Sequence, residues 1–161
     1  MHIRSATPAD IAEICAIWNP IIRDTLITFT TVEQNPATIA KLLEAKAEHD
    51  LPFLVADAGK IAGFATYGPF RSGPGYAHTA EHTIILAPWA RGQGTGRDLL
   101  QAIEDHARAH GIHALIGGVS GANPGGVAFH AACGFRQIAT LPQVGRKAEQ
   151  WLDLVLMQKL L

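Results

Sequence analysis

The feature that most constrains the fold is a short apolar strand that runs into a glycine-rich turn and then into a long amphipathic helix. The strand is expected at residues 83–86, Pro88 ends it, and residues 91–96 contain three glycines. In such a turn, backbone N–H groups and the helix N-terminus converge on an anion. The helix is expected at about residues 96–110, with Leu99, Leu100, Ile103 and Ala107 facing inward and Gln101, Glu104, Asp105 and Arg108 facing water. The sequence therefore predicts an anion site at the turn.

Strands and helices alternate over the rest of the chain. Thr7 and Pro8 are the expected N-cap and first residue of a helix that follows a short first strand. Further helices are expected at residues 36–48 and 127–133, and further strands at 53–56, 61–67, 113–119, 135–140 and 151–157. The predicted order is β-α-α-β-β-β-α-β-α-β-β, which indicates an α/β fold with a mixed sheet.

The length of 161 residues is typical of one domain, so residues 1–161 are expected to form a single domain. Hydrophobic residues make up 48% of the chain and charged residues 17%, which excludes a disordered chain. The net charge of −1 excludes a broad attraction to nucleic acid or to an anionic membrane. No segment resembles a signal peptide or a membrane span, so a cytoplasmic protein is expected. Cys15 and Cys133 are expected to be reduced packing residues.

The glycine-rich turn does not have the spacing of the common nucleotide-binding motifs. A Walker loop needs GxxxxGK[ST], which the chain lacks, so hydrolysis of a nucleoside triphosphate is not expected. A Rossmann turn needs GxGxxG and an acidic residue at the end of the next strand, whereas this turn has GxGxG and that strand ends at residues 117–119 without an acid. The remaining interpretations are an anion site of another kind and a plain tight turn between a strand and a helix.

The pattern Arg91-x-x-Gly94-x-Gly96 resembles the Q/R-x-x-G-x-G/A signature of the GCN5-related N-acetyltransferases. Asn123, followed by a short helix that ends in Gly134-Phe135, resembles a second element of that family. The resemblance implies a single-domain acyl-CoA N-acyltransferase fold, with a mostly antiparallel sheet flanked by helices, and acetyl-CoA as the acetyl donor. It also implies cofactor contacts along the strand end and the turn, at Ile84, Ile85, Leu86, Arg91, Gly92, Gln93, Gly94, Thr95, Gly96, Arg97 and Asn123.

Within that family, the chain is most similar to phosphinothricin and methionine sulfoximine N-acetyltransferases. The similarity lies in residues 69–71, 78–82, 145–147 and 151–154. It implies a small amine substrate that is like an amino acid and carries an anionic group, with Arg71 near the anion and Glu81 near the amine. That subgroup often has a second arginine where this chain has Gly73, which puts phosphinothricin itself in doubt. The similarity also implies a homodimer.

Acetyl transfer needs a base for the amine, donors for the oxyanion and a proton for the departing thiolate. Glu81 is the predicted general base, because it is expected just before a buried strand, where desolvation raises the pKa of a carboxyl. His130 lies where relatives place a group near the sulfur, so it either donates to the thiolate, touches the substrate or packs as an ordinary histidine. Arg71 is either a bidentate anion contact or an exposed loop arginine, and Asn123 is either a cofactor contact or a turn residue.

Two other classes of function compete with this interpretation. Residues 78–82 fit HxxEH, a zinc-protease motif, but the motif needs a helix, and positions four apart in extended backbone are separated by about 13 Å. We therefore expect no metal. The other class is a module that binds coenzyme A without catalysis. Among acetyltransferases, the acceptor amine stays open between amino-acid-like compounds, peptide N-termini, polyamines and aminoglycosides.

Overall fold

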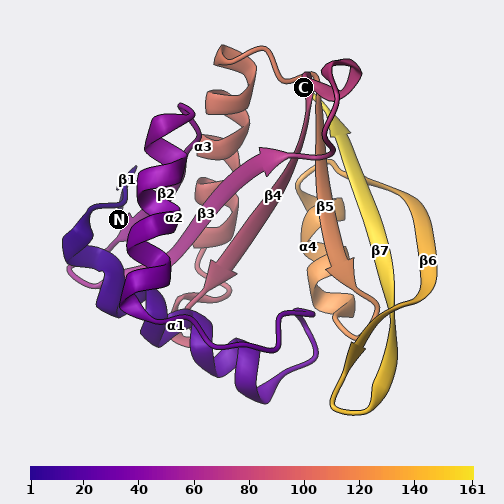
Figure 1. Cartoon of the computed structure of the whole chain (residues 1–161), viewed down its shortest axis with the longest axis horizontal. Helices are drawn as coiled ribbons and strands as arrows, with labels where there is room; N and C mark the ends of the chain where they lie inside the picture. The colour runs from indigo at the N-terminus through magenta and orange to yellow at the C-terminus, as the bar shows by residue number, and fades with distance from the viewer.

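Seven strands form one mixed sheet in the order β1-β2-β3-β4-β5-β7-β6 in the computed structural model, which describes residues 1–161 (Figure 1). Every neighbouring pair is antiparallel except β4 and β5, which are parallel. The strands are β1 His2–Ser5, β2 Phe53–Asp57, β3 Ile61–Pro69, β4 Thr79–Leu86, β5 Ala114–Ser120, β6 Arg136–Lys147 and β7 Gln150–Leu160. The predicted order of strands and helices is confirmed.

Four α-helices cover the two faces of the sheet. They are α1 Ile11–Asp24, α2 Pro36–Glu48, α3 Thr95–Ala109 and α4 Pro124–Ala132. In Figure 1, α1 and α2 lie in front of the sheet and α3 and α4 lie behind it. Three short 3-10 turns, η1 Pro8–Asp10, η2 Pro74–Tyr76 and η3 Pro88–Ala90, join these elements. None of the helices is both long and apolar enough to cross a membrane.

The hydrophobic core fills the space between the sheet and its helices. The predicted inward face of α3 is confirmed, because Leu99, Leu100, Ile103 and Ala107 are at most 1% exposed. On the other face, the Phe64 ring of β3 stacks on Phe53 at 5.2 Å between ring centres. Burying one large apolar side chain contributes about 1.5–3 kcal/mol, so the buried residues of α3 hold this helix on one face and the aromatic contacts stabilise the other.

The prediction that Glu104 faces water is wrong. Glu104 is 2% exposed, and both of its carboxylate oxygens accept from Lys159 of β7 at 2.8 Å. Arg108 donates to the same carboxylate at 3.1 Å. The helical periodicity could not show this, because the neighbour that covers Glu104 comes from a strand at the far end of the chain.

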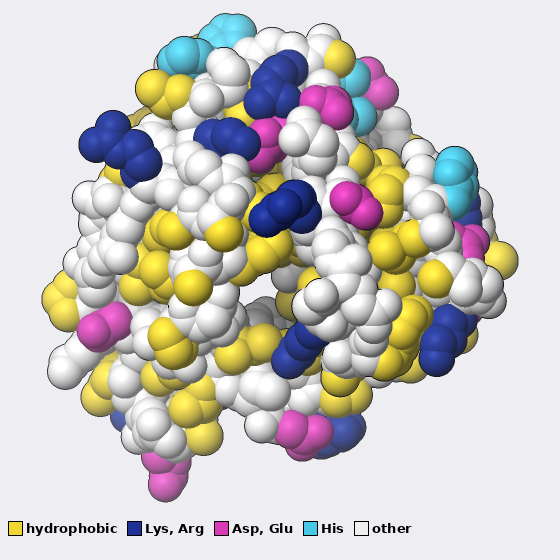
Figure 2. All heavy atoms as spheres, turned by 180° about the vertical axis from the view of Figure 1, so that it is seen from behind, with side chains coloured by type: hydrophobic (Ala, Val, Ile, Leu, Met, Phe, Trp, Pro, Cys, Tyr) yellow, Lys and Arg dark blue, Asp and Glu magenta, His cyan; other side chains and the backbone are white.

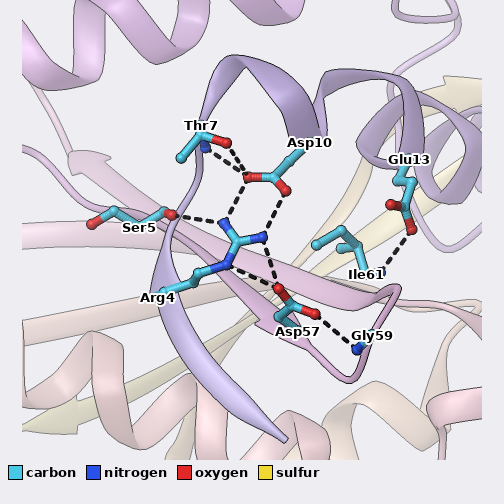
Figure 3. A network of polar contacts seen from close by, with 8 residues as sticks. All are labelled: Arg4, Ser5, Thr7, Asp10, Glu13, Asp57, Gly59 and Ile61. Atoms are coloured by element: carbon cyan, nitrogen blue, oxygen red, sulfur yellow. Dashed lines mark hydrogen bonds and ion pairs between the residues drawn. The ribbon is translucent and has the colours of Figure 1, made fainter.

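An ion-pair network ties the start of the chain to the sheet (Figure 3). The Arg4 guanidinium of β1 donates to Asp10 at 2.8 Å and to Asp57 at 2.9 Å. Thr7 occupies the N-cap position before Pro8, as predicted, and its backbone N–H donates to Asp10. Arg4 and then Thr7 hold the pKa of the Asp10 carboxyl at about 2. The network therefore joins β1, η1 and β2.

Several elements differ in length from the prediction. The strand expected at 83–86 begins four residues earlier in β4. Of the last two strands, β6 begins one residue later than expected but continues to Lys147, and β7 extends beyond its expected range at both ends. Sequence alternation underestimates β6 because the strand is mostly exposed and its register with β7 shifts twice. The fourth strand was underestimated because its first half, residues 79–82, contains the polar site residues instead of a continuous apolar run.

Candidate active site

The sheet opens at its centre, where β4 and β5 part. The two strands are paired from Thr79 with Ala114 to His82 with Gly117. We call this last pair the parting point. Beyond it, β4 continues to Leu86 and β5 to Ser120 without pairing with each other. Figure 1 shows the two strands diverging, and Figure 2 shows a deep hollow near the same central position, with hydrophobic side chains around it. The edge of β4 that faces this opening therefore has backbone groups free for a ligand.

The glycine-rich turn lies between β4 and α3, beside this opening. Gly92 and Gly94 have φ values of 73° and 86°, which side chains other than glycine rarely adopt. Gly96 serves a different purpose, since a Cβ there would lie 3.1 Å from Phe129 of α4 and 3.2 Å from Leu86 of β4. Two glycines thus shape the turn, and the third lets α3 pack closely against β4 and α4.

Unpaired donors gather at the N-terminus of α3. Gly94 is the N-cap, and no side chain caps the first N–H groups of the helix. The hydroxyl of Thr95 is buried and has no hydrogen-bond partner. Buried polar groups are normally paired, so an unpaired hydroxyl beside uncapped N–H groups fits an anionic ligand at this place. These residues fit the diphosphate group of coenzyme A.

The other predicted residues of the turn lie at its surface. Arg91 is exposed, and the side-chain amide of Gln93 donates to the Trp89 carbonyl at 2.6 Å. Arg97 lines a cavity of about 200 Å³ between α3 and α4, together with Cys133 and Lys159. Arg91 therefore lies in the turn that leads into α3, whereas Arg97 lies on the helix itself and faces the cavity between α3 and α4.

Glu81 lies within β4, two residues along the strand, and not just before it as predicted. It is opposite Gly68 of β3 and Ile116 of β5, one residue before the parting point. Its carboxylate lies over Gly118 of β5, where a Cβ would be 2.8 Å from Oε1. Both residues are exposed, yet desolvation by the surrounding protein raises the pKa of Glu81, and the charge of Arg71 opposes this shift. A carboxyl with a raised pKa on an open face is suited to accept a proton.

His82 and His130 form a buried pair on the opposite face of the sheet from Glu81. Their Nε2 atoms are 2.9 Å apart, and the Nδ1 of His130 is 2.7 Å from the Gly126 carbonyl. Both ring nitrogens of His130 therefore have partners within the protein. Gly117 leaves room for the two rings, since a Cβ there would lie 3.0 Å from each. Desolvation lowers the pKa of both histidines. Sequence reasoning missed His82, although its place beside Glu81 in an alternating strand was a signal.

Arg71 and Gly73 line one cavity of about 350 Å³ between the β3–β4 loop and the sheet. Tyr67, Tyr76 and Ala80 also line it, whereas Glu81 does not. Gly73 has a φ of 112°, so the backbone there disfavours any side chain. This conformation gives a physical reason for glycine in place of a second arginine.

Asn123 caps α4. Its Oδ1 accepts from the Gly126 N–H at 3.0 Å, and the helix begins at Pro124 in spite of the two glycines that follow. A Cβ at Gly126 would lie 2.5 Å from the Asn123 amide nitrogen, so glycine is required there. Asn123 is thus the N-cap of α4. Its side-chain oxygen is used by this cap, whereas its side-chain amide nitrogen has no hydrogen-bond partner in the protein.

The histidines of the HxxEH motif do not meet. The segment is a strand from Thr79 onward, and His78 just before it lies 2.7 Å through Nδ1 from the Gly111 carbonyl. His82 points to α4 instead. A second histidine pair, His106 and His110 on α3, stacks with ring centres 3.9 Å apart and contacts a tyrosine hydroxyl and an aspartate.

Known proteins resemble this chain over nearly its whole length. The family profile described as the acetyltransferase (GNAT) domain matches residues 3–156. The L-methionine sulfoximine/L-methionine sulfone acetyltransferase of Pseudomonas paraeruginosa is 35% identical, over 97% of this chain and 92% of that protein. The solved ribosomal-protein-alanine N-acetyltransferase from Brucella melitensis is 38% identical with a TM-score of 0.96, over 100% of both chains. A GNAT superfamily phosphinothricin acetyltransferase from Sinorhizobium meliloti, solved with acetyl-CoA, is 29% identical with a TM-score of 0.92, over 99% of this chain and 88% of that one.

Proposed function

Because this chain belongs to the GNAT acetyltransferase family, we propose that it moves the acetyl group of acetyl-CoA to the amine of a small amino-acid-like substrate. The observation that carries the proposal is the place of Glu81, one residue before the parting point and on an exposed face. Its carboxylate is held over a glycine, next to backbone groups that have no strand partner. The proposal therefore has a base and free hydrogen-bonding groups at the same opening.

Coenzyme A is proposed to bind along the free edge of β4 and across the N-terminus of α3. When bound, acetyl-CoA supplies the thioester carbonyl that the amine attacks. The backbone of Ile84, Ile85 and Leu86 would hydrogen-bond the pantetheine arm, and the turn from Arg91 to Arg97 would hold the diphosphate. The uncapped N–H groups and the unpaired Thr95 hydroxyl support this assignment. For Asn123, we propose a contact through the amide nitrogen, since its oxygen caps α4.

Glu81 is the proposed general base. A substrate amine must be neutral to attack, so a carboxylate that accepts its proton increases the reactive fraction. Desolvation raises the pKa of Glu81 towards the working range of a base, and Arg71 keeps part of the charged form. The amine proton would pass to a Glu81 oxygen directly or through one water molecule.

The acceptor is proposed to carry an anionic group that Arg71 binds. Methionine sulfoximine and methionine sulfone have an α-amine and a carboxylate, and a relative that is named for them is 35% identical. Arg71 offers a planar fork of donors that matches a carboxylate. Gly73 removes the possibility of a second guanidinium at that place, so a compound with a second strongly anionic group is a weaker candidate.

His130 is proposed to lie near the thioester end of the cofactor. It faces the parting point from α4, behind Gly117. Its ring is held at both nitrogens, so it cannot donate a proton in the usual way unless one of these hydrogen bonds opens.

Another amine acceptor is the main alternative. A solved relative at 38% identity is named a ribosomal-protein-alanine N-acetyltransferase, which favours including a peptide N-terminus among the candidates. A module that binds coenzyme A without turnover, and a zinc peptidase, are weaker alternatives. The two histidines of the HxxEH segment point to different elements, which argues against the peptidase.

A thiol-release assay tests the proposal. Acetyl-CoA would be offered with methionine sulfoximine, methionine sulfone, phosphinothricin, ordinary amino acids, an alanyl peptide, polyamines and aminoglycosides. We expect turnover with the amino-acid-like compounds, and turnover of only the peptide, a polyamine or an aminoglycoside would contradict the acceptor class. Glu81→Gln should lower kcat/KM about 10²–10⁴-fold while acetyl-CoA still binds by calorimetry. Glu44→Gln, on the exposed side of α2, is the matched control. Full activity of Glu81→Gln would refute the base assignment.

A homodimer is also proposed. Large hydrophobic side chains are exposed on the last two strands, at Ile138, Val144 and Trp151, with exposed fractions of 50–58%. Exposed large hydrophobic residues on two neighbouring strands favour association. Light scattering coupled to size-exclusion chromatography would decide this, and a monomer mass at micromolar concentration would contradict the proposal.

A further inference from the structure

The buried pair of His82 and His130 lies directly at the parting point, and only one member was expected there. His82 is in the last residue pair that joins β4 to β5, and it is 5% exposed. His130 is on α4, which packs on the β5 side of the opening, and it is 6% exposed. The bond between their Nε2 atoms, 2.9 Å long, therefore connects the two halves of the sheet at the place where they separate.

The hydrogen bonds determine where the ring protons lie. The Gly126 carbonyl can only accept, so the Nδ1 of His130, 2.7 Å away, must carry a hydrogen. In a neutral imidazole, the other nitrogen then has none, so the Nε2 of His130 is an acceptor. The contact of 2.9 Å between the two Nε2 atoms then requires the hydrogen to be on His82. The Nδ1 of His82 is left without a hydrogen, and no protein group makes a hydrogen bond of good geometry with this buried atom.

Burial disfavours the charged form of both rings, in agreement with this assignment. Desolvation is the largest influence on both, and it lowers the pKa of His82 to about 3 and that of His130 below its usual value. The only titratable side chain that acts on His82 is His130, and the backbone of Ile116 opposes the shift. No carboxylate faces either ring to stabilise a cation.

We propose that His82 is a positioning residue for the acetyl transfer: the Gly126 carbonyl sets the tautomer of His130, and the Nε2–H of His82 donates to the Nε2 of His130 and so fastens α4 to β4 at the parting point. This inference rests on the proposed function, because it concerns the same opening. The Nε2 of His130 then accepts the hydrogen of His82, and its Nδ1–H is bonded to the Gly126 carbonyl. His130 therefore has no free hydrogen to donate to the departing thiolate. The role of the pair is to fix the distance between the free edge of β4 and the C-terminal half of α4.

The neighbours of the pair explain why a small displacement there matters. Gly117 lies under both rings with almost no spare room, and Phe135 packs against both of them with ring centres 5.4 Å from His82 and 5.3 Å from His130. If the bond is lost, these rings have no polar contact that fixes their separation. A misplacement of about 1 Å near a reaction centre can lower the rate about 10²-fold.

Nuclear magnetic resonance of the full chain tests the tautomers without any substrate. Two-bond correlations between ring protons and ring nitrogens distinguish the two neutral forms of each histidine. In the wild type, we expect hydrogen on Nδ1 of His130 and on Nε2 of His82 in the neutral rings, with no titration of His82 between pH 6 and 8. Hydrogen on Nε2 of the neutral His130 ring, or a titration of His82 in that range, would overturn the assignment.

Two substitutions at one position separate the donor from the bulk of the ring. His82→Gln keeps an N–H donor near the place of Nε2, whereas His82→Leu removes it. We expect His82→Leu to lower kcat about 10- to 100-fold with KM for acetyl-CoA within about twofold, while His130 keeps the Nδ1–H tautomer that the Gly126 carbonyl sets. We expect His82→Gln to keep that tautomer and most of kcat. His110→Leu, an exposed histidine at the end of α3, is the control and should change neither.

The outcomes keep the two proposals apart. If the wild type acetylates no amine on the panel, the proposed function fails, and the tautomer measurement still decides the hydrogen-bond assignment. If the wild type is active and His82→Leu keeps its kcat, His82 does not position the reaction. Equal losses in His82→Gln and His82→Leu would also overturn the proposal, since they would assign the effect to packing. If His82→Leu fails to fold, the wild type and His82→Gln still provide the tautomer and kinetic tests.

Discussion

Replacing Gly118 with alanine would place a methyl group directly against the proposed base. The Cβ of such an alanine would lie 2.8 Å from Oε1 of Glu81 and 3.4 Å from a methyl group of Leu154. An ordinary contact begins at 3.4 Å, so the carboxylate would have to retreat by about 0.6 Å. Glu81 is exposed and its carboxylate is the end of a flexible side chain, so it has room to do so.

The expected cost falls on activity and not on stability. A misplacement of about 1 Å costs about 10²-fold in rate, so a retreat of about 0.6 Å should lower kcat/KM about tenfold. Gly118 has no unusual backbone angle, and glycine inside a strand is about 0.5–1 kcal/mol less favourable than alanine. Gly118→Ala should therefore be at least as stable as the wild type while being a poorer enzyme.

Thiol release with the best acceptor and thermal unfolding would be measured on the same preparations. Gly75→Ala is the matched control, because a Cβ there meets nothing within 4 Å. It should leave both activity and unfolding temperature unchanged. A calorimetric titration with acetyl-CoA would show whether the cofactor still binds to each variant.

A folded Gly118→Ala variant with kcat/KM within twofold of the wild type would refute the reasoning. In that case, the position of the Glu81 carboxylate would not limit the reaction, and the base would have to be sought elsewhere. A large fall in unfolding temperature would refute a different step, namely that the clash is relieved by the side chain and not by the backbone.

Two further predictions concern the stability of the fold. Gly63→Ala would bring a Cβ to 2.6 Å from the backbone oxygen of Ile85 and from a methyl group of Leu86, so β3 and β4 must separate locally. We expect the free energy of unfolding in urea to fall by about 1–3 kcal/mol. An unchanged urea midpoint would contradict the close approach of the two strands. The folded pKa of Asp10 is about 2, below its ordinary 3.8, so its contribution is complete above about pH 4 and is lost as the pH falls through 2. The Asp10 ionisation contributes about 2 kcal/mol to the free energy of unfolding. Asp10→Asn should therefore be less stable than the wild type at pH 6 and nearly equal to it at pH 2, unlike the exposed control Asp105→Asn. An equal difference in stability at both pH values would refute this prediction.

Local patterns were enough to predict most of the elements. Periodicity of apolar residues predicted α3 and its buried face, and Thr7-Pro8 marked the first helix start because capping depends on adjacent residues. The bounds of α2 were predicted at Pro36–Glu48 and are those of the structure. The burial of Glu104 was not predictable, because its partner Lys159 is 55 residues away along the chain.

The candidate site divides in the same way. The glycine spacing from residue 92 to 96 and the resemblance that it carries pointed to coenzyme A, because a phosphate-binding turn is made of consecutive backbone groups. Glu81 was singled out because residues 78–82 resemble the phosphinothricin and methionine sulfoximine acetyltransferases. The partner of His130 was not, since the pairing of His82 with a residue 48 positions later depends on how α4 packs on the sheet. The reason for Gly73 also needed the backbone angle.

The sequence by itself therefore determined the order of strands and helices, because this order depends on periodicity and capping within short stretches of chain. The spacing of the turn carried the resemblance to the family, and that resemblance implied the acetyl donor. Only the tertiary structure decided where β4 and β5 part, which face Glu81 occupies, and that His82 and His130 share one hydrogen bond across that opening. Strand pairing and helix packing join residues that are distant in the chain, and no local pattern records the distances that result.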